Sequence, residues 1–327
     1  MPAPQTLASG GGSAARSGSV LFVLVAVLCA VWGSTWLVIR GGLRDLPPFT
    51  SAGVRFAIAA VVMTGVAAAL RRREGGESPP LWLSCTLGLT SFAGSYGVVY
   101  WCETVLPSGL VALLWSVYPM IQAVAGHLFL PGERLNRRQW IGFLFGLAGL
   151  ALLFGTDLQG FGDAGIPAAL LLFASPVLAT IGSTVTKRFG GGVSSVLLNR
   201  DAMFAGAIVL LALALSCEQG AIQTWSAQAV ASVLYLALVG TALTFGVYFW
   251  LLRRFAAHKL GLISYVVPVI ALALGWGFGS EPVTTATLGG AALILFGVVI
   301  VARVRGPSAP ADARRDRADG GDSRESG

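Results

Sequence analysis

Residues 20–39 read VLFVLVAVLCAVWGSTWLVI, an unbroken apolar stretch. At about 1.5 Å per residue, a stretch of roughly this length crosses the ~30 Å hydrocarbon core of a bilayer as one α-helix. It follows Arg16 but has no clean small-residue cleavage site behind it, so we interpret it as a retained helix and not as a secretory signal. Backbone amides in hydrocarbon must be hydrogen-bonded within their own segment, so each similar stretch predicts another helix.

Further apolar runs follow, separated by turn signals such as Leu46-Pro47-Pro48 and Gly190-Gly191-Gly192. Together the runs cover approximately residues 20–40, 48–70, 81–103, 108–130, 137–156, 164–187, 193–216, 227–252, 259–279 and 284–304. Only 11% of the residues are charged and 55% are hydrophobic, whereas a soluble domain carries about 25% charged residues. We therefore predict an all-α integral membrane protein with ten transmembrane helices, between disordered tails at residues 1–18 and 306–327.

The positions of the basic residues predict the orientation. With the amino terminus inside, the inside loops hold most of the Lys and Arg, including Arg71-Arg72-Arg73 and Arg137-Arg138, while the outside loops hold Arg40, Arg44 and several acids. This asymmetry follows the positive-inside rule and places both termini in the cytoplasm. It also accounts for the net charge of +7 through membrane topology, so we expect no nucleic-acid partner.

The chain repeats itself at an offset of about 149 residues. Gly33-Ser34-Thr35 recurs as Gly182-Ser183-Thr184, Tyr96-Gly97-Val98 recurs as Phe245-Gly246-Val247, and Pro119 recurs as Pro268. Each unit has five predicted helices, an odd number, so the second unit lies inverted relative to the first. Inverted repeats suit a carrier, because two halves of opposite sense can expose one midplane site to either side in turn.

These residues resemble a known family. Trp32-Gly33-Ser34, then Leu46-Pro47-Pro48-Phe49 with Arg55-Phe56, and Pro119 followed by Gly132-Glu133-Arg134-Leu135 are similar to the EamA repeat of the drug/metabolite transporter superfamily. Pro131 departs from the pattern by adding a residue before Glu133. The resemblance covers residues 19–157 as a first repeat and 162–305 as a second. It implies ten helices, an inner-membrane location, and export or exchange of amino acids and other small metabolites.

Ionisable groups inside apolar runs cost about 2.5–3.5 kcal/mol each on insertion scales. Arg55 lies some seven residues into the second run and can either bind a substrate carboxylate or snorkel and pair with a neighbouring helix. Asn199, Arg200 and Asp201 lie at a similar depth from the opposite side, where Arg200 can bind substrate or pair with Asp201. Glu103 ends a helical stripe with Tyr96 and Tyr100, and we interpret it as a solvated acid at the rim, with a proton site as the alternative.

Aromatic and hydroxyl side chains share helix faces, and such groups bind zwitterionic or aromatic metabolites when they face a wet cavity. Helix packing and interfacial anchoring explain each residue alone equally well. The residues that we predict to bind substrate are Trp32, Thr35, Arg55, Tyr96, Tyr100, Tyr118, Gln122, Thr184, Asn199, Tyr248 and Tyr265. Pro119 and Pro268 remove a backbone hydrogen bond in mid-helix and suit gating helices.

The fifth and tenth runs carry glycine in place of polar groups. Gly142, Gly146 and Gly149 share one face, as do Gly290 and Gly297, so we place these helices outside the central cavity. Such a seam serves either packing within the protomer or a homodimer interface, and the sequence does not choose.

The sequence favours no catalytic or cofactor chemistry. It has no GxSxG, HExxH or phosphate-binding glycine motif, and two histidines with four scattered cysteines do not predict a metal site. We expect neither an enzyme nor a cofactor, and transport driven by a gradient or by exchange. The prediction is a secondary transporter of small metabolites with the bilayer as its surroundings; the alternative is a membrane protein without transport activity, such as a sensor or assembly factor.

Overall fold

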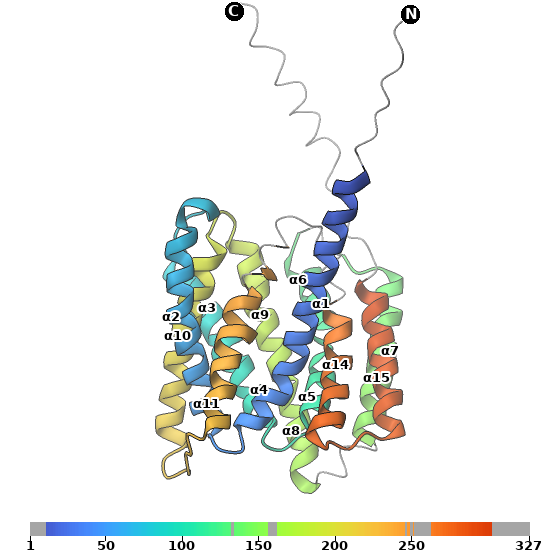
Figure 1. The fold of residues 1–327 in the computed structure, drawn as a ribbon. Coiled ribbons are helices and arrows are strands. Elements are labelled where there is room, and N and C mark those ends of the chain that lie inside the picture. The colour runs from blue at the N-terminus through green and yellow to red at the C-terminus, as the bar shows by residue number, and fades with distance from the viewer. Residues whose placement is uncertain are drawn as a thin grey trace, which may run out of the picture.

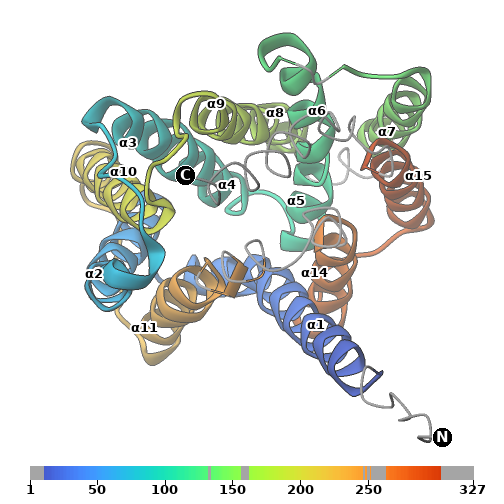
Figure 2. The same cartoon turned by 90° about the horizontal axis from the view of Figure 1, so that it is seen from above.

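The computed structural model describes residues 11–131, 134–155, 162–245, 247–248, 251 and 263–302. These residues are helical and contain no β-strand beyond one isolated bridge between Glu77 and Val193. The helices stand side by side (Figure 1) and form a ring when they are seen along their axes (Figure 2). The elements are α1 (Gly11–Gly42), α2 (Pro48–Glu74), α3 (Leu81–Leu87), η1 (Gly88–Ser95), α4 (Tyr96–Cys102), α5 (Ser108–Trp115), α6 (Tyr118–Phe129), α7 (Arg137–Gly155), α8 (Gly165–Leu172), α9 (Ala174–Phe189), α10 (Ser195–Cys217), α11 (Ala227–Leu234), η3 (Tyr235–Leu243), α14 (Ile263–Gly279) and α15 (Thr285–Ala302).

The first helix is longer than we expected. It begins at Gly11, inside the segment 1–18 that composition predicts to be a disordered tail. Ala14, Ala15 and Arg16 are strong helix formers, and no proline interrupts the chain between Pro4 and Pro47. The apolar helix therefore extends backwards into a polar segment. The remaining tail residues, 1–10 and 303–327, lie outside the described part of the chain.

Length and composition make several helices able to cross a membrane. Five are long and apolar enough by these measures: Leu21–Gly42, Pro48–Leu70, Ser108–Phe129, Gly162–Phe189 and Ser195–Cys217. Shorter apolar helices cover Ala227–Leu243, Val266–Gly279 and Thr285–Ile300. Proline begins α2 at its first position, where the missing N–H is not needed.

Two segments are wound as π-helices in the middle of the bundle. η1 continues α3 into α4, and η3 continues α11, both without a break in the chain. They begin at Gly88 and Tyr235, close to the spacing at which the sequence repeats. The i→i+5 pattern is rare and is frequently found at functional sites. Both repeats therefore carry the same unusual element at the same place.

The glycine seams predicted for the fifth and tenth runs pack against each other within the chain. Gly149 lies against the carbonyl of Gly290, where an added Cβ would come within 2.7 Å, and Gly297 lies against the backbone of Gly142 and Gly146. Small residues permit this close approach of α7 and α15. Figure 2 shows the two helices together at one edge of the ring, apart from α1, α2 and α4.

We expect Gly297→Ala to destabilise the protein by about 1–3 kcal/mol, the usual range for overpacking. Its new methyl group would meet the Gly142 carbonyl, with the Gly146 nitrogen and Met120 Cε each at 2.8 Å. Thermal unfolding in detergent measures the effect. Gly65→Ala is the matched control, because no atom lies within 4 Å of an added Cβ there. Equal unfolding midpoints for the two variants would contradict this packing.

Candidate functional site

Arg55 of α2 is the largest fully buried side chain of the described residues, with 1% of its surface exposed. Its Nε and Nη2 donate to Thr241 Oγ1 at 3.2 and 3.1 Å, and its Nη1 donates to the Tyr100 hydroxyl at 3.2 Å. Thr241 belongs to η3, and its hydroxyl donates to the carbonyl of Leu236, five residues back, at 2.7 Å. The π-helix therefore shapes the acceptor that holds the guanidinium.

Aromatic rings surround the same guanidinium. Its central carbon lies 5.1 Å from the ring centroid of Phe56, 5.0 Å from that of Tyr96 and 6.0 Å from that of Tyr100. Such contacts stabilise a buried cation by about 0.5–2 kcal/mol each. The predicted stripe of Tyr96 and Tyr100 thus faces Arg55, and the two tyrosines help to hold its charge.

No carboxylate of the described residues forms an ion pair with Arg55. The pairs that these residues do form join Arg40 to Glu281 at 3.5 Å and Arg200 to Asp201 at 2.7 Å. Of the two interpretations of Arg200, the structure therefore shows the pairing with Asp201. Within the described part of the chain, the partners of this buried cation are hydroxyls and rings, an arrangement that is costly. A guanidinium also has the donor geometry to bind a carboxylate through two hydrogen bonds.

A second polar cluster lies on α6 and α9. Tyr118 donates to Ser183 Oγ at 3.3 Å, Ser183 donates to Gln122 Oε1 at 2.6 Å, and Gln122 donates to Thr184 Oγ1 at 3.3 Å. The Tyr118 ring stacks on Trp115 with centroids 4.9 Å apart. Of the predicted residues, the structure thus brings together Tyr118, Gln122 and Thr184. Ser183 was missed, although it belongs to the repeated Gly-Ser-Thr motif.

Trp32 forms a third cluster with the end of the η3 segment. Its Nε1 donates to Thr244 Oγ1 at 3.1 Å, and its ring lies 5.7 Å from that of Tyr248. Thr35, one turn further along α1, is buried, and its hydroxyl donates to the Trp32 carbonyl at 2.7 Å. The Thr35 hydroxyl is therefore bonded to the backbone of its own helix.

Serine 95 occupies the place in the first repeat that Thr244 occupies in the second. Its hydroxyl bonds Ser175 Oγ at 2.8 Å, and Ser175 also accepts from Trp115 Nε1 at 2.9 Å. Each π-helical segment therefore ends on a hydroxyl that contacts the first helical run of the opposite repeat.

The remaining predicted residues are Asn199, Tyr265, Pro119 and Pro268. Asn199 donates to the carbonyl of Ser195 at 2.9 Å, one turn back in α10, so the structure does not bring its amide to the Arg55 cluster. The side chain of Tyr265 lies outside the described residues. Pro119 stands at the start of α6, after a break in the helix at Ser116-Val117, and Pro268 lies inside α14.

Glu103 is not the solvated rim acid that its position suggests. It lies at the end of α4 with 2% of its surface exposed, and both carboxylate oxygens are buried without a hydrogen-bond donor among the described residues. Arg40 of α1, Arg55 of α2 and Glu281 lie near it, and such tertiary neighbours cannot be read from helix periodicity.

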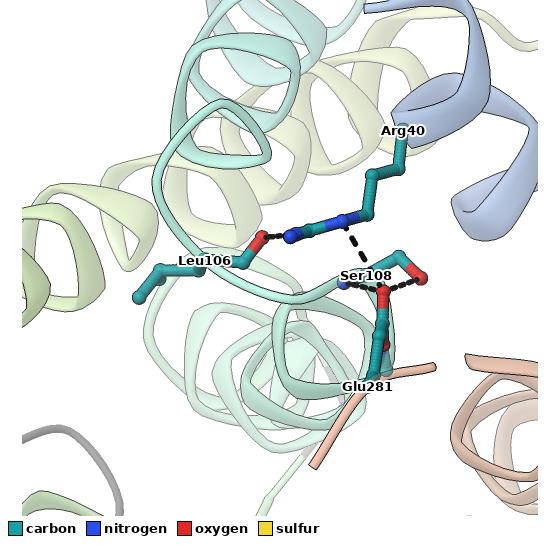
Figure 3. A network of polar contacts seen from close by, with 5 residues as sticks. Arg40, Leu106, Ser108 and Glu281 are labelled. Carbon is teal, nitrogen blue, oxygen red and sulfur yellow. Dashed lines mark hydrogen bonds and ion pairs between the residues drawn. The ribbon is translucent and has the colours of Figure 1, made fainter. Parts of the chain in front are cut away.

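A polar network joins three segments that are far apart in the sequence: the end of α1, the start of α5 with the turn before it, and the segment before α15 (Figure 3). Arg40 at the end of α1 donates to the Leu106 carbonyl at 2.5 Å, and its Nε lies 3.5 Å from Glu281 Oε1. The same carboxylate accepts from the Ser108 amide at 2.8 Å, the Ser108 hydroxyl at 2.7 Å and the Gly109 amide at 2.9 Å. We call Arg40, Leu106, Ser108, Gly109 and Glu281 the Arg40–Glu281 network.

A second carboxylate, that of Glu218, binds the N-terminal residues of α2. Glu218 accepts from the Phe49 amide at 2.6 Å, and from the Thr50 amide and hydroxyl at 2.9 and 2.7 Å. Carboxylates are favoured at helix N-termini because the first N–H groups have no partner within the helix. Two acids of the second repeat thus cap two helices of the first, an arrangement that sequence analysis did not find because the partners are more than 160 residues apart.

An open apolar groove of about 580 Å³ lies between α1, α2 and η3. Its lining is Leu24, Val62, Val66, Leu238, Ala242, Leu243 and Val247. None of these side chains offers a hydrogen bond or a charge to a solute, and none of them is a partner of Arg55.

Fold and site together define a membrane protein: apolar helices of spanning length around a buried cation with aromatic and hydroxyl partners. The chain matches the EamA-like transporter family twice, over residues 18–155 and 166–303, and it belongs to this family.

Several proteins named as transporters are similar in sequence to this chain over most of its length. YoaV, an uncharacterized transporter of Bacillus subtilis, is 27% identical over 82% of this chain and 91% of its own. YedA, an uncharacterized inner membrane transporter of Escherichia coli K12, is 29% identical over 86% of this chain and 90% of its own. A probable amino-acid metabolite efflux pump of Salmonella typhimurium is 28% identical over 87% of this chain and 94% of its own. One crystal structure superposes with a TM-score of 0.62 over 86% of this chain and 97% of that chain, at 21% identity, which shows a shared fold.

Proposed function

We propose that the protein is a secondary carrier that moves small metabolites bearing a carboxylate across the cell (inner) membrane by alternating access. The observation that carries the proposal is Arg55, a buried guanidinium with no carboxylate partner among the described residues, held by one hydroxyl from each repeat. A solute carboxylate would supply the missing counter-charge. The relative named as an amino-acid metabolite efflux pump supports export of such solutes.

The proposal includes ten spans in two inverted repeats. The described elements group into α1, α2, α3–η1–α4, α5–α6 and α7, followed by α8–α9, α10, α11–η3, α14 and α15. The repeated family match and the equivalent π-helices support the duplication. The one-sided distribution of Lys and Arg supports cytoplasmic termini, and the Arg40–Glu281 network then lies at the outer end.

With this orientation, we infer that the Arg40–Glu281 network holds the outer end closed. Arg55 is sealed from solvent, so a solute reaches it only after one end opens. The arrangement fits a carrier, in which closed and open ends alternate around one site. A sensor or assembly factor has no need of a buried, unpaired cation of this kind.

A thermal-shift screen of amino acids, amines, sugars and nucleosides on purified protein tests the proposed function. A bound ligand raises the unfolding midpoint by mass action, and we expect carboxylate-bearing compounds to do so. The compound with the largest shift is then tested for counterflow in liposomes. Stabilisation without counterflow would favour a sensor, and a screen in which only amines or sugars stabilise the protein would overturn the carboxylate class.

Cysteine labelling tests the inverted topology. In a background with Cys29, Cys85, Cys102 and Cys217 replaced by serine, we expect Thr285→Cys to react with an impermeant maleimide in intact cells. We expect Arg137→Cys to react only after permeabilisation. Both positions are exposed in the structure. Equal reactivity of the two cysteines in intact cells would contradict the inversion.

A further inference from the structure

Glu103 carries the inference because its carboxyl group is buried and makes no hydrogen bond within the described part of the chain. Both oxygens have less than 1 Å² of accessible surface and no donor among the described residues. An ionised carboxylate without donors in a low-dielectric interior is costly, so a buried acid of this kind takes up a proton. The neutral acid needs much less solvation and can remain where it is.

The charged side chains near Glu103 have bonds to other groups. Arg40 of α1, Arg55 of α2 and Glu281 before α15 act on it electrostatically, and Tyr96 and Tyr100 precede it on α4. Arg40 binds the Leu106 carbonyl and Glu281, while Arg55 binds Thr241 and Tyr100. Glu281 repels a second negative charge. The backbone N–H of Arg40 favours the ionised carboxylate, but it does not reach hydrogen-bond geometry with either oxygen.

The position of Glu103 couples it to the outer end. Only the short turn after Glu103 separates it from Leu106, Ser108 and Gly109, all of which take part in the Arg40–Glu281 network. Opening that network lets water reach the carboxyl group. Hydration stabilises the ionised form, so the closed state binds the proton more tightly than the open state.

We propose that Glu103 is a proton-binding site that holds a proton while the outer end is closed and releases it when that end opens. The O–H bond of the carboxylic acid breaks, the proton passes to water, and a carboxylate remains near Arg40 and Arg55. The reaction is a simple acid dissociation and needs no other reactant. The inference rests on the proposed outer gate, but the protonation itself can be measured whether or not the chain transports.

Infrared spectroscopy of the protein in lipid nanodiscs measures the protonation directly. Protonated carboxylic acids have a C=O stretching band apart from the bands of amides and carboxylates. We expect this band at neutral pH in the wild type and its loss in Glu103→Gln. Glu103→Asp keeps a titratable carboxyl group and should show a shifted band. A wild-type spectrum at neutral pH without a band assignable to Glu103 would overturn the proposal.

The link to opening is tested by labelling Thr35→Cys from the outside in the cysteine-free background. Thr35 is 8% exposed and lies on α1, inward of Arg40. The state with the higher proton affinity loses population as pH rises, so opening should increase by up to about tenfold per pH unit for one linked proton. We expect this increase in the protein with Glu103 and a flat profile in Glu103→Gln.

Gln219→Cys controls for the pH dependence of the thiol, because it is exposed at the same end and its label does not report opening. Glu281→Gln should expose Thr35→Cys at every pH and, by hydrating Glu103, weaken the carboxylic acid band. If the pH profile of Thr35→Cys labelling, corrected with the Gln219→Cys control, is the same with Glu103→Gln as without it, protonation of Glu103 is not linked to opening. Absence of transport in liposomes would leave both results standing and would count only against the proposed function.

Discussion

Arg55→Met should abolish transport while leaving the protein folded and about as stable as the wild type. Arg55 has 1% of its surface exposed and no carboxylate partner among the described residues. Replacing a buried ion by an apolar residue of similar volume is often neutral or stabilising. The hydroxyls of Tyr100 and Thr241 lose a donor, and an unsatisfied buried group costs about 1–3 kcal/mol. The two effects oppose each other.

The expected effect of Arg55→Met on carboxylate binding is larger, and every contribution to it weakens binding. Removing one partner of a buried charge pair costs about 2–5 kcal/mol, which corresponds to at least ~30-fold weaker binding of a carboxylate. Arg55→Lys keeps the charge but loses the planar fork, so it should retain insertion and bind more weakly. Thermal shift with the carboxylate compound selected by screening measures binding, and counterflow of that compound measures transport.

Arg200→Met is the matched control for Arg55. Arg200 also lies in a helix, but its guanidinium pairs with Asp201 and its side chain is 27% exposed. We expect ligand-induced stabilisation and counterflow to remain near wild-type values. If Arg55→Met binds and transports like the wild type, or if it unfolds while Arg200→Met does not, then Arg55 has a structural role and the proposed site is wrong.

Glu281→Gln should open the outer end. The carboxylate accepts three hydrogen bonds from Ser108 and Gly109 and pairs with Arg40. Hydrogen bonds to a charged group contribute about 1.5–3 kcal/mol each. An amide keeps one acceptor but turns an N–H group toward the donors of α5. We therefore expect at least about tenfold faster labelling of Thr35→Cys from the outside, since ~1.4 kcal/mol suffices for that factor.

Glu218→Gln separates opening from general destabilisation. Glu218 caps α2 through three similar bonds, whereas Arg40 of α1 belongs to the Arg40–Glu281 network. Both variants should lower the unfolding midpoint, and only Glu281→Gln should accelerate labelling of Thr35→Cys. Similar acceleration in both variants would mean that capping in general, and not the Arg40–Glu281 network, keeps the outer end closed.

The sequence by itself determined the helical architecture and the duplication. Apolar runs of spanning length leave the backbone no alternative to helix, and the spaced matches around Gly33-Ser34-Thr35 and Pro119 show the repeat. The glycine faces of residues 142–149 and 290–297 predicted close packing but left open whether it lies within the protomer or in a homodimer, and the structure shows α7 against α15 within the chain. These features depend on local composition, which the sequence states directly.

The tertiary structure alone decided how the polar residues are used. Burial of Arg55 was open to two interpretations, and only the approach of Thr241 from η3 and of Tyr100 from α4 shows what holds it. Glu103 ends its helix like a rim acid, yet it is buried in the folded protein. Glu218 and Glu281 cap helices that begin far away in sequence. Helix periodicity gives the face on which a side chain lies, whereas its charge partners depend on which distant helix packs against that face.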